Sequence, residues 1–287
     1  MGGIFMGNEQ RQEIQEQRTE YSKLFVNEDH SFTREIYLDA IHYQDDDGKW
    51  EEMDDSLTEE QESVDENVGD STEENTATLT AENGETDFGN KKGNWKVKFY
   101  KHSRKQGTIS VRKERCMITW ALENSAKVTA VERNNEILYP DILPGVDDHL
   151  YIKGMTVKEN LILKTSEAGA VFDFAYHTKK LHPVEIDDSV CFINDDEEEV
   201  FIVTAPYMKD ASGARSEKIS ISLIDEGKKD RCKIRFSADE QWLKAAERVY
   251  PVAIDPITTT SKKRDEIYDA HVDSRYAVDN FYNSIIL

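Results

Sequence analysis

The sequence predicts a mainly β protein made of antiparallel, sandwich-like modules. In many short segments apolar residues alternate with polar ones, and this two-residue period is typical of half-buried strands. Turn-forming pairs separate these segments, among them Asp47-Gly48, Pro144-Gly145 and Glu226-Gly227. Long helical periods are almost absent, so we expect the strands to pair with one another in antiparallel sheets.

Residues 1–24 are expected to form a short helical segment with frayed ends. Residues 8–24 contain good helix formers, but their apolar stripe consists of Ile14, Tyr21 and Leu24 alone. A helix with so narrow an apolar stripe would lie on the surface of the protein.

The β-rich module is expected to extend from residue 25 to residue 257. One short helix near residues 238–247 should interrupt it, because Ser237 and Glu240 have the spacing of a capping box just before Trp242 and Leu243. Pro251 restricts the last segment to a sheet edge or a strand terminus. The segments that we expect to be strands are residues 32–38, 95–99, 118–122, 150–152, 161–163, 171–176, 190–193, 200–203, 219–224, 232–236 and 249–254.

Acidic residues are concentrated in one stretch. Residues 45–87 hold 18 acidic residues and one basic residue, so they contribute −17 to the net charge of −22. We predict a disordered acidic insertion over residues 58–92, because residues 57–87 contain no aromatic residue and too few branched apolar ones to offset the entropy of ordering. Deleting residues 58–87 should therefore change the melting temperature little.

The segment that follows is basic. Residues 91–115 hold ten lysines and arginines, with Glu114 as the acidic residue among them. We interpret the acidic and basic blocks as solvated surfaces. A contact between them would be weak and screened by salt.

The net charge narrows the classes of function. A charge of −22 argues against generic binding to nucleic acid or to an anionic membrane, because phosphate groups would be repelled. No apolar segment is long enough for a membrane span. The first six residues do not have the basic and apolar regions of a signal peptide.

Residue patterns with a known chemistry are missing. Cys116, Cys191 and Cys232 all fall in strand-like segments and are expected to be buried free thiols. The spacing of His177 and His182 does not suit a zinc site, and Asp45-Asp46-Asp47-Gly48 indicates a hairpin turn instead of a calcium loop. We identify no catalytic residue, no cofactor and no metal ligand. Paired carboxylates for glycoside hydrolysis cannot be singled out among 58 acidic residues.

The four tryptophans offer one candidate binding surface. Trp50, Trp95, Trp120 and Trp242 could form a platform that stacks on a glycan, although alternating segments usually bury such residues in the core. Three hypotheses follow: a non-catalytic β scaffold, which we favour, a module that binds carbohydrate or cell wall, and an enzyme similar to a glycoside hydrolase.

Four distinctive phrases follow one another along the chain. The first contains IHYQDDDGKW, the second PGVDDHLYIKGMTVKENLIL, the third PYMKDASG and the fourth RVYPVAIDP. In this order they resemble the amino-terminal region of secreted, wall-associated YD-repeat (Rhs-type) proteins of Gram-positive bacteria. Together they cover most of residues 18–256. The resemblance implies a secreted or wall-associated scaffold that precedes further domains of the same polypeptide, which would be its partners.

The last part of the sequence extends this resemblance. Residues 258–287 are expected to be a linker followed by the truncated start of another β domain. Residues 265–287 are similar to the first strands of the surface domain named for an Asp-Asn-Arg-Leu-Arg-Glu motif. The resemblance therefore implies a fragment of a protein that would continue with repeats and a toxin, while the acidic insertion departs from the family pattern.

Overall fold

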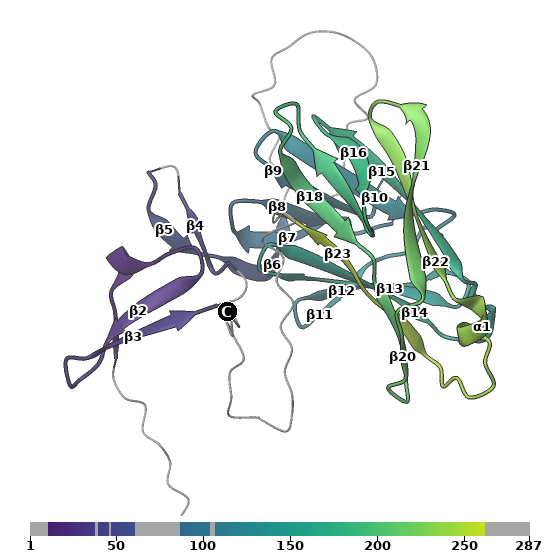
Figure 1. The fold of residues 1–287 in the computed structure, drawn as a ribbon, viewed down its shortest axis with the longest axis horizontal. Coiled ribbons are helices and arrows are strands. Elements are labelled where there is room, and N and C mark those ends of the chain that lie inside the picture. Colours follow the sequence, from purple (N-terminus) through teal and green to yellow (C-terminus); the bar gives the residue numbers. More distant parts are fainter. Residues whose placement is uncertain (1–10, 38–39, 46, 61–86, 104–106, 262–287) are drawn as a thin grey trace, which may run out of the picture.

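The computed structural model of the chain describes residues 11–37, 40–45, 47–60, 87–103 and 107–261. It is almost entirely β structure, and every strand pair is antiparallel (Figure 1). A small unit formed by the first five strands lies beside a larger sandwich of two sheets. The predicted mainly β fold class is confirmed.

The small unit does not contain the helix that we expected near the amino terminus. In the described part of residues 1–24, two strands flank a single 3-10 turn, η1 (Gln15–Gln17). The backbone N–H of Ile14 donates to the carbonyl of Leu24 at 2.8 Å, so these two apolar residues meet across neighbouring strands and not along a helix. The strands of this sheet are β1 (Gln12–Glu13), β2 (Ser22–Val26) and β3 (Phe32–Ile36).

The hairpin predicted around Asp47-Gly48 is confirmed. Strands β4 (His42–Gln44) and β5 (Trp50–Glu52) pair across it, with Gln44 opposite Trp50. Gly48 has a φ of +75°, a conformation that a side chain disfavours. The Asp45 side chain accepts hydrogen bonds from the backbone N–H groups of Asp47 and Lys49, and these bonds close the turn.

The first layer of the sandwich is an eight-stranded sheet. Its order is β21-β22-β15-β10-β9-β8-β7-β6, so strands distant in sequence lie side by side in its centre. The strands are β6 (Asp54–Glu60), β7 (Asp87–Lys92), β8 (Lys96–Phe99), β9 (Ile109–Lys113), β10 (Cys116–Leu122), β15 (Val171–Lys179), β21 (Ile219–Lys228) and β22 (Arg231–Ala238).

The second layer is a ten-stranded sheet with β23 (Val252–Thr260) in its centre. This strand pairs with β14 on one side and with β18 and β19 on the other. The other strands are β11 (Val131–Arg133), β12 (Glu136–Leu143), β13 (Val146–Lys153), β14 (Thr156–Leu163), β16 (His182–Ile186), β17 (Ser189–Ile193), β18 (Glu199–Thr204), β19 (Tyr207–Asp210) and β20 (Arg215–Ser216).

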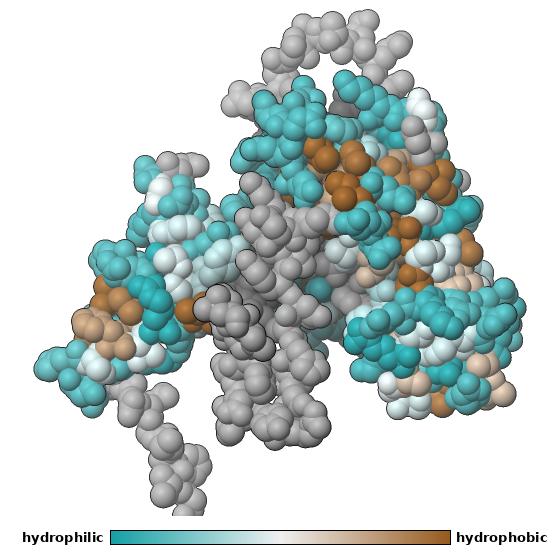
Figure 2. Space-filling model, in the orientation of Figure 1, coloured by the Kyte–Doolittle hydropathy of each residue, from teal (hydrophilic) through white to brown (hydrophobic). Residues whose placement is uncertain are grey.

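One continuous apolar core joins the two layers. Trp120 and Tyr176, opposite each other on β10 and β15, stack with ring centroids 5.5 Å apart. Phe192 of the other layer packs against Tyr176 at 5.4 Å. Each large side chain buried in this way stabilises the fold by about 1.5–3 kcal/mol. On the face seen in Figure 2, the lower part of the sandwich is mainly hydrophilic and hydrophobic groups gather over its upper part.

The structure contradicts both ends of the acidic insertion that we predicted over residues 58–92. Its two ends are strands, because β6 runs to Glu60 and β7 spans Asp87–Lys92. In β7, Phe88 and Asn90 are both buried. The Asn90 side chain donates to the Trp95 carbonyl and accepts from the Val97 N–H. The sequence of this strand does not alternate between apolar and polar residues, so its pattern did not predict a strand. The remainder of the predicted insertion, residues 61–86, lies outside the described residues.

The second helix and the end of the module also differ from expectation. Helix α1 (Glu240–Leu243) begins two residues later than a Ser237 cap would place it. Its N-cap is Asp239, whose side chain accepts from the N–H groups of Gln241 and Trp242. Strand β23 continues through Thr260, so the expected linker cannot begin at residue 258. Residues 262–287, with the resemblance to a following domain, lie outside the described residues.

Within the described residues, no helix has the length and apolar character needed to cross a membrane.

Candidate functional site

The four tryptophans do not form one exposed row. Trp95 and Trp120 are 1% and 0% exposed, so neither ring can stack on a glycan unless the sandwich opens. Trp50 on β5 and Trp242 on α1 are half-buried. The Arg248 guanidinium already lies over the Trp242 ring, 3.8 Å from its centroid. Glycan stacking by Trp50 or Trp242 remains a prediction.

A pair of carboxyl groups lies inside the sandwich, and sequence reasoning missed it. Asp148 of β13 and Glu159 of β14 are 1% and 2% exposed. Asp148 is opposite Leu161 and Glu159 is opposite Leu150, so the two acids are diagonal neighbours on the inner face of the sheet. They hydrogen-bond each other, and from the opposite layer Trp120 Nε1 donates to Glu159 Oε2 at 2.9 Å.

Burial controls the protonation of this pair. Removal from water raises the pKa of Glu159 to about 7 and raises the pKa of Asp148 well above its usual range, because a charged carboxylate is poorly solvated there. No lysine or arginine contributes to either pKa. The two groups therefore share a proton, with Asp148 as donor and Glu159 as acceptor.

The surroundings of the pair are polar but uncharged. The Tyr139 hydroxyl donates to the Tyr100 carbonyl at 2.6 Å, and burial raises the pKa of both Tyr139 and Tyr176 well above 10. Among the described residues, the Oδ1 atom of Asp148 has no hydrogen-bond partner. Two coupled carboxyl groups could perform acid-base chemistry in a cleft, but this pair is enclosed by the core and no substrate can reach it.

A second firm contact joins two of the phrases quoted above. Asp210 ends β19, and one of its carboxylate oxygens accepts from the N–H groups of Ser212 and Ala214. The other accepts from Arg248 Nη1 at 2.7 Å and from the Val249 N–H. The hydrogen bond from the Ser212 hydroxyl is the largest cause that lowers the pKa of Asp210, to about 2. This arrangement fixes the turn after β19 against the entry to β23.

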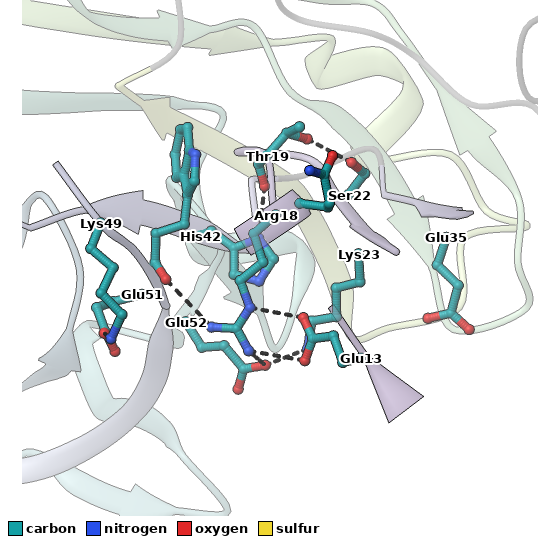
Figure 3. Close-up of polar contacts among 12 residues, drawn as sticks. Glu13, Arg18, Thr19, Ser22, Lys23, Glu35, His42, Lys49, Glu51 and Glu52 are labelled. Carbon is teal, nitrogen blue, oxygen red and sulfur yellow. Dashed lines mark hydrogen bonds and ion pairs between the residues drawn. The ribbon is translucent and has the colours of Figure 1, made fainter. Parts of the chain in front are cut away.

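The small unit is held together by a polar cluster around Arg18. Figure 3 shows the Arg18 side chain between Glu13 and Glu52. Arg18 Nη1 also donates to the Trp50 carbonyl at 3.4 Å. Arg18 donates to both carboxylate oxygens of Glu13, at 2.8 and 2.9 Å, a paired geometry that raises the pKa of Arg18 and lowers that of Glu13. Lys23 pairs with Glu52 from the other side. These contacts connect the three-stranded sheet to the β4–β5 hairpin.

His42 completes this cluster. Its imidazole is 0% exposed, and Nδ1 lies 2.7 Å from the Thr19 carbonyl (Figure 3). A carbonyl only accepts, so Nδ1 carries the proton. Nε2 of the same ring is buried and has no hydrogen-bond partner among the described residues. The His42 ring thus connects β4 to the turn that precedes β2.

Other candidate chemistry is not assembled in the described residues. Cys116, Cys191 and Cys232 are buried thiols outside any disulfide, and burial raises the pKa of the Cys116 thiol. In the same part of the chain, no group of three or more histidines, cysteines or acids could hold a metal ion. A small recess beside η2 (Ser166–Ala168) includes Glu240, but this acid already pairs with Lys244 at 2.6 Å.

Comparison with known proteins shows similarity to a wall-associated protein. A protein described as "Wall-associated protein" from Geobacillus stearothermophilus is 29% identical over 207 residues, which are 70% of this chain and 75% of that protein. No protein-family model matches the chain. No solved structure matches it significantly.

The longer relatives are WapA proteins of Bacillus. "tRNA(Glu)-specific nuclease WapA" of Bacillus subtilis subsp. natto is 31% identical over 280 residues, which are 94% of this chain and 11% of that protein. "tRNA3(Ser)-specific nuclease WapA" of Bacillus spizizenii gives the same identity and coverage. The homologues of this chain are thus WapA and wall-associated proteins. The chain spans about a tenth of the length of the WapA relatives.

Proposed function

We propose that this chain is the non-catalytic, amino-terminal β scaffold of a secreted, wall-associated protein of the YD-repeat type that delivers a toxin. The observation that carries this proposal is that the chain is equally similar to two relatives whose names specify different tRNA substrates. The chain is 31% identical over 280 residues both to a tRNA(Glu)-specific and to a tRNA3(Ser)-specific nuclease. A segment that determined the choice of tRNA would differ between those two relatives.

The arrangement of the polar side chains supports a role without catalysis. The coupled carboxyl pair is enclosed between the two sheets, and its hydrogen bonds go to core residues. The other firm polar contacts, at Asp210 and Arg18, connect neighbouring segments of the chain. Each of these groups is used to hold strands together.

The same proposal assigns the partners of the chain. Further domains of the polypeptide would follow it, starting with the surface domain that residues 265–287 resemble and continuing with YD repeats and a carboxyl-terminal toxin. Nuclease activity would belong to that distant part. The scaffold would present it outside the cell.

Two experiments test the proposal. The purified chain should leave total tRNA intact, with the Bacillus spizizenii relative as the positive control. A chimera should also be made in which this chain replaces the aligned 280 residues of that relative. We expect the chimera to be found in the wall fraction and to remain toxic to sensitive cells.

A destabilised chimera tests whether wall association requires the folded scaffold. Trp120→Asp in the chimera buries a further carboxyl group beside Glu159, which should unfold the scaffold and abolish wall association, whereas Val171→Thr, at an exposed position, should not. Cleavage of tRNA by the isolated chain that one carboxylate substitution removes would overturn the proposal. A folded chimera that never reaches the wall would overturn it as well.

A further inference from the structure

Strand β3 lies at the edge of the three-stranded sheet, and its outer edge is open. Among the described strands it pairs with β2 alone (Figure 1). The backbone N–H of Tyr37 donates to the Tyr21 carbonyl at 2.8 Å, and such bonded pairs recur at every second residue. The backbone groups of Phe32, Arg34 and Ile36 therefore point away from β2. No described residue bonds these outer groups.

The other long sheet edges in the described part of the chain are protected. On β6, the Leu57 N–H donates to the side chain of Asn135, which covers the outer edge of the strand. On β21, the Leu223 N–H donates to Glu185 at 2.6 Å. Strand β16 contains Pro183, which has no N–H to offer. The edge strands β1, β4, β5, β11 and β20 have two or three residues each. Short strands, prolines and covering side chains are the usual protection of an edge, and β3 has none of these.

The side chains along the open edge are apolar and exposed. Phe32 is 66% exposed and Ile36 is 71% exposed. Both lie on the face of the sheet that also carries Leu24 and Val26 of β2. Figure 2 shows hydrophobic groups over this part of the small unit. An edge strand with such side chains is a template for pairing with a further strand.

One charge lies between the two apolar side chains. Arg34 is exposed and shares the face of Phe32 and Ile36. Its Nη1 atom donates to Ser22 Oγ at 2.9 Å and to the Gln17 carbonyl at 3.4 Å, so the guanidinium is fixed beside the edge. Both of these acceptors are neutral. The charge of Arg34 therefore favours a carboxylate on any strand that pairs with β3.

The same arginine opposes pairing with a second copy of the chain. If two β3 strands paired antiparallel along their full length, Phe32 of each would lie opposite Ile36 of the other. The two Arg34 side chains would then be directly opposite each other, and like charges in that position destabilise a strand pair. A strand with an acidic residue there would form a charge pair instead.

We propose that the outer edge of β3 binds an extended segment of another polypeptide, which adds to the sheet as an antiparallel strand. The segment carries an acidic residue opposite Arg34 and apolar residues opposite Phe32 and Ile36. Main-chain hydrogen bonds to these three residues hold the segment, and the side chains select its sequence. The proposed function does not assign this partner, because it concerns domains of the same polypeptide.

Two peptides derived from β3 itself are the probes. Both have the sequence of residues 31–37 and a fluorescein label, and one of them carries Arg34→Glu. When this peptide pairs antiparallel with β3, its acid lies opposite Arg34 and its apolar residues lie opposite Phe32 and Ile36. The unchanged peptide is the matched control, because it places an arginine opposite Arg34. Fluorescence anisotropy with the full chain measures both affinities.

We expect the Arg34→Glu peptide to bind at least about fivefold more tightly than the unchanged peptide at low salt, since a charge pair replaces a repulsion. The difference should shrink as salt is added. With the Arg34→Glu variant of the full chain, the preference between the two peptides should reverse. Equal affinities, a preference that does not reverse, or no binding of either peptide would overturn the proposal.

A pair of double variants tests the apolar contacts. Phe32→Ser/Ile36→Ser should weaken binding of the Arg34→Glu peptide by at least about fivefold. Val171→Ser/Val249→Ser is the matched control, because it alters two exposed apolar residues outside the small unit, and it should bind within about twofold of the parent chain. Circular dichroism checks that all variants fold. Equal losses in the two double variants would count against the edge of β3.

Hydrogen exchange identifies the mode of binding. The N–H groups of Phe32, Arg34 and Ile36 face outward, so an added strand should accept from them and slow their exchange. The N–H groups of Thr33 and Glu35 already bond β2 and should change little. Binding without this protection, measured by NMR, would overturn strand addition. A dimer of the parent chain that Phe32→Ser/Ile36→Ser dissociates would also overturn the proposal and would identify a second copy as the partner.

Discussion

Inward polar residues decide how the sandwich responds to pH. Asp148 lies between Val146 and Leu150, and Glu159 lies between Val157 and Leu161, all buried positions of alternating strands. The strands expected from the sequence, residues 150–152 and 161–163, include neither acid, although the alternation of buried positions continues through both. The sequence could not show that Trp120, from another sheet, would donate to Glu159.

The raised pKa of Glu159 predicts a loss of stability as the pH rises. This pKa is about 7 in the folded chain, against 4.5 for an ordinary glutamate. The unfolded chain loses the Glu159 proton at lower pH, so this contribution to stability is complete below about pH 4.5 and is lost as the pH rises through about 7. The loss should be roughly 3 kcal/mol of unfolding free energy.

Urea unfolding at pH 4.5, 6, 7 and 8 measures this dependence. The Asp148→Asn/Glu159→Gln variant should lack the added slope, because neither amide titrates. Glu114→Gln/Asp195→Asn, which alters two exposed acids, should keep it. Parallel curves for the parent chain and the buried double variant would show that the pair does not titrate in this range.

Gly107 gives a second prediction for a single residue. A Cβ atom at this position would lie 2.1 Å from the Cγ2 methyl of Thr119, which is buried on β10. Gly107→Ala should therefore destabilise the chain by about 1–3 kcal/mol through overpacking. Thr119→Ser removes that methyl, so the Gly107→Ala/Thr119→Ser variant should recover most of the loss. Thermal unfolding of the parent chain and the three variants checks this, and a double variant no more stable than Gly107→Ala would contradict the clash.

Among the elements, strands with a clear alternation were easier to predict than the segments at the ends of the module. Residues 118–122 and 171–176 alternate strictly, and both lie in central strands of the eight-stranded sheet. The amino-terminal segment has helix-forming residues, but its contacts with β2 outweigh that preference because local propensity is weak. Only tertiary contacts could reveal this outcome.

Removal of residues 61–86 tests the junction of β6 and β7. These strands pair through contacts such as Leu57 with Asn90, which the deletion leaves intact. Replacing the 26 residues by a four-residue glycine-serine turn shortens the loop, which should raise the unfolding free energy by at most about 2 kcal/mol. Urea unfolding provides the measurement. A clear loss of stability would mean that the deleted residues contribute contacts of their own.

The end of β23 can be tested by truncation. A chain ending at Ile257 loses the pairing of residues 258–260 with both β14 and β18, and it loses the buried Thr259 side chain. We expect a loss of about 2–5 kcal/mol, since several backbone hydrogen bonds disappear at once. A chain ending at Ser261 should match the full chain. Equal stability of the two truncated chains would place the functional end of the strand before residue 258.

For the whole molecule, the layered β architecture could be predicted and the neighbours of each strand could not. Turn residues and two-residue periods are local, and they are sufficient to predict antiparallel sheets. Which strands become neighbours depends on contacts between distant segments, such as β10 with β15 and β14 with β23. The sequence therefore predicted a strand within residues 32–38 but not that its outer edge would stay open.

The position of β23 also sets an order of events for folding. The strand lies between β14 and β18 in the middle of its sheet, yet it is the last strand of the described chain. The ten-stranded layer cannot close until the ribosome has made Thr260, and contacts so far apart in sequence form slowly. The nascent module stays open until that point, which leaves time for any passage across a membrane that requires an unfolded chain.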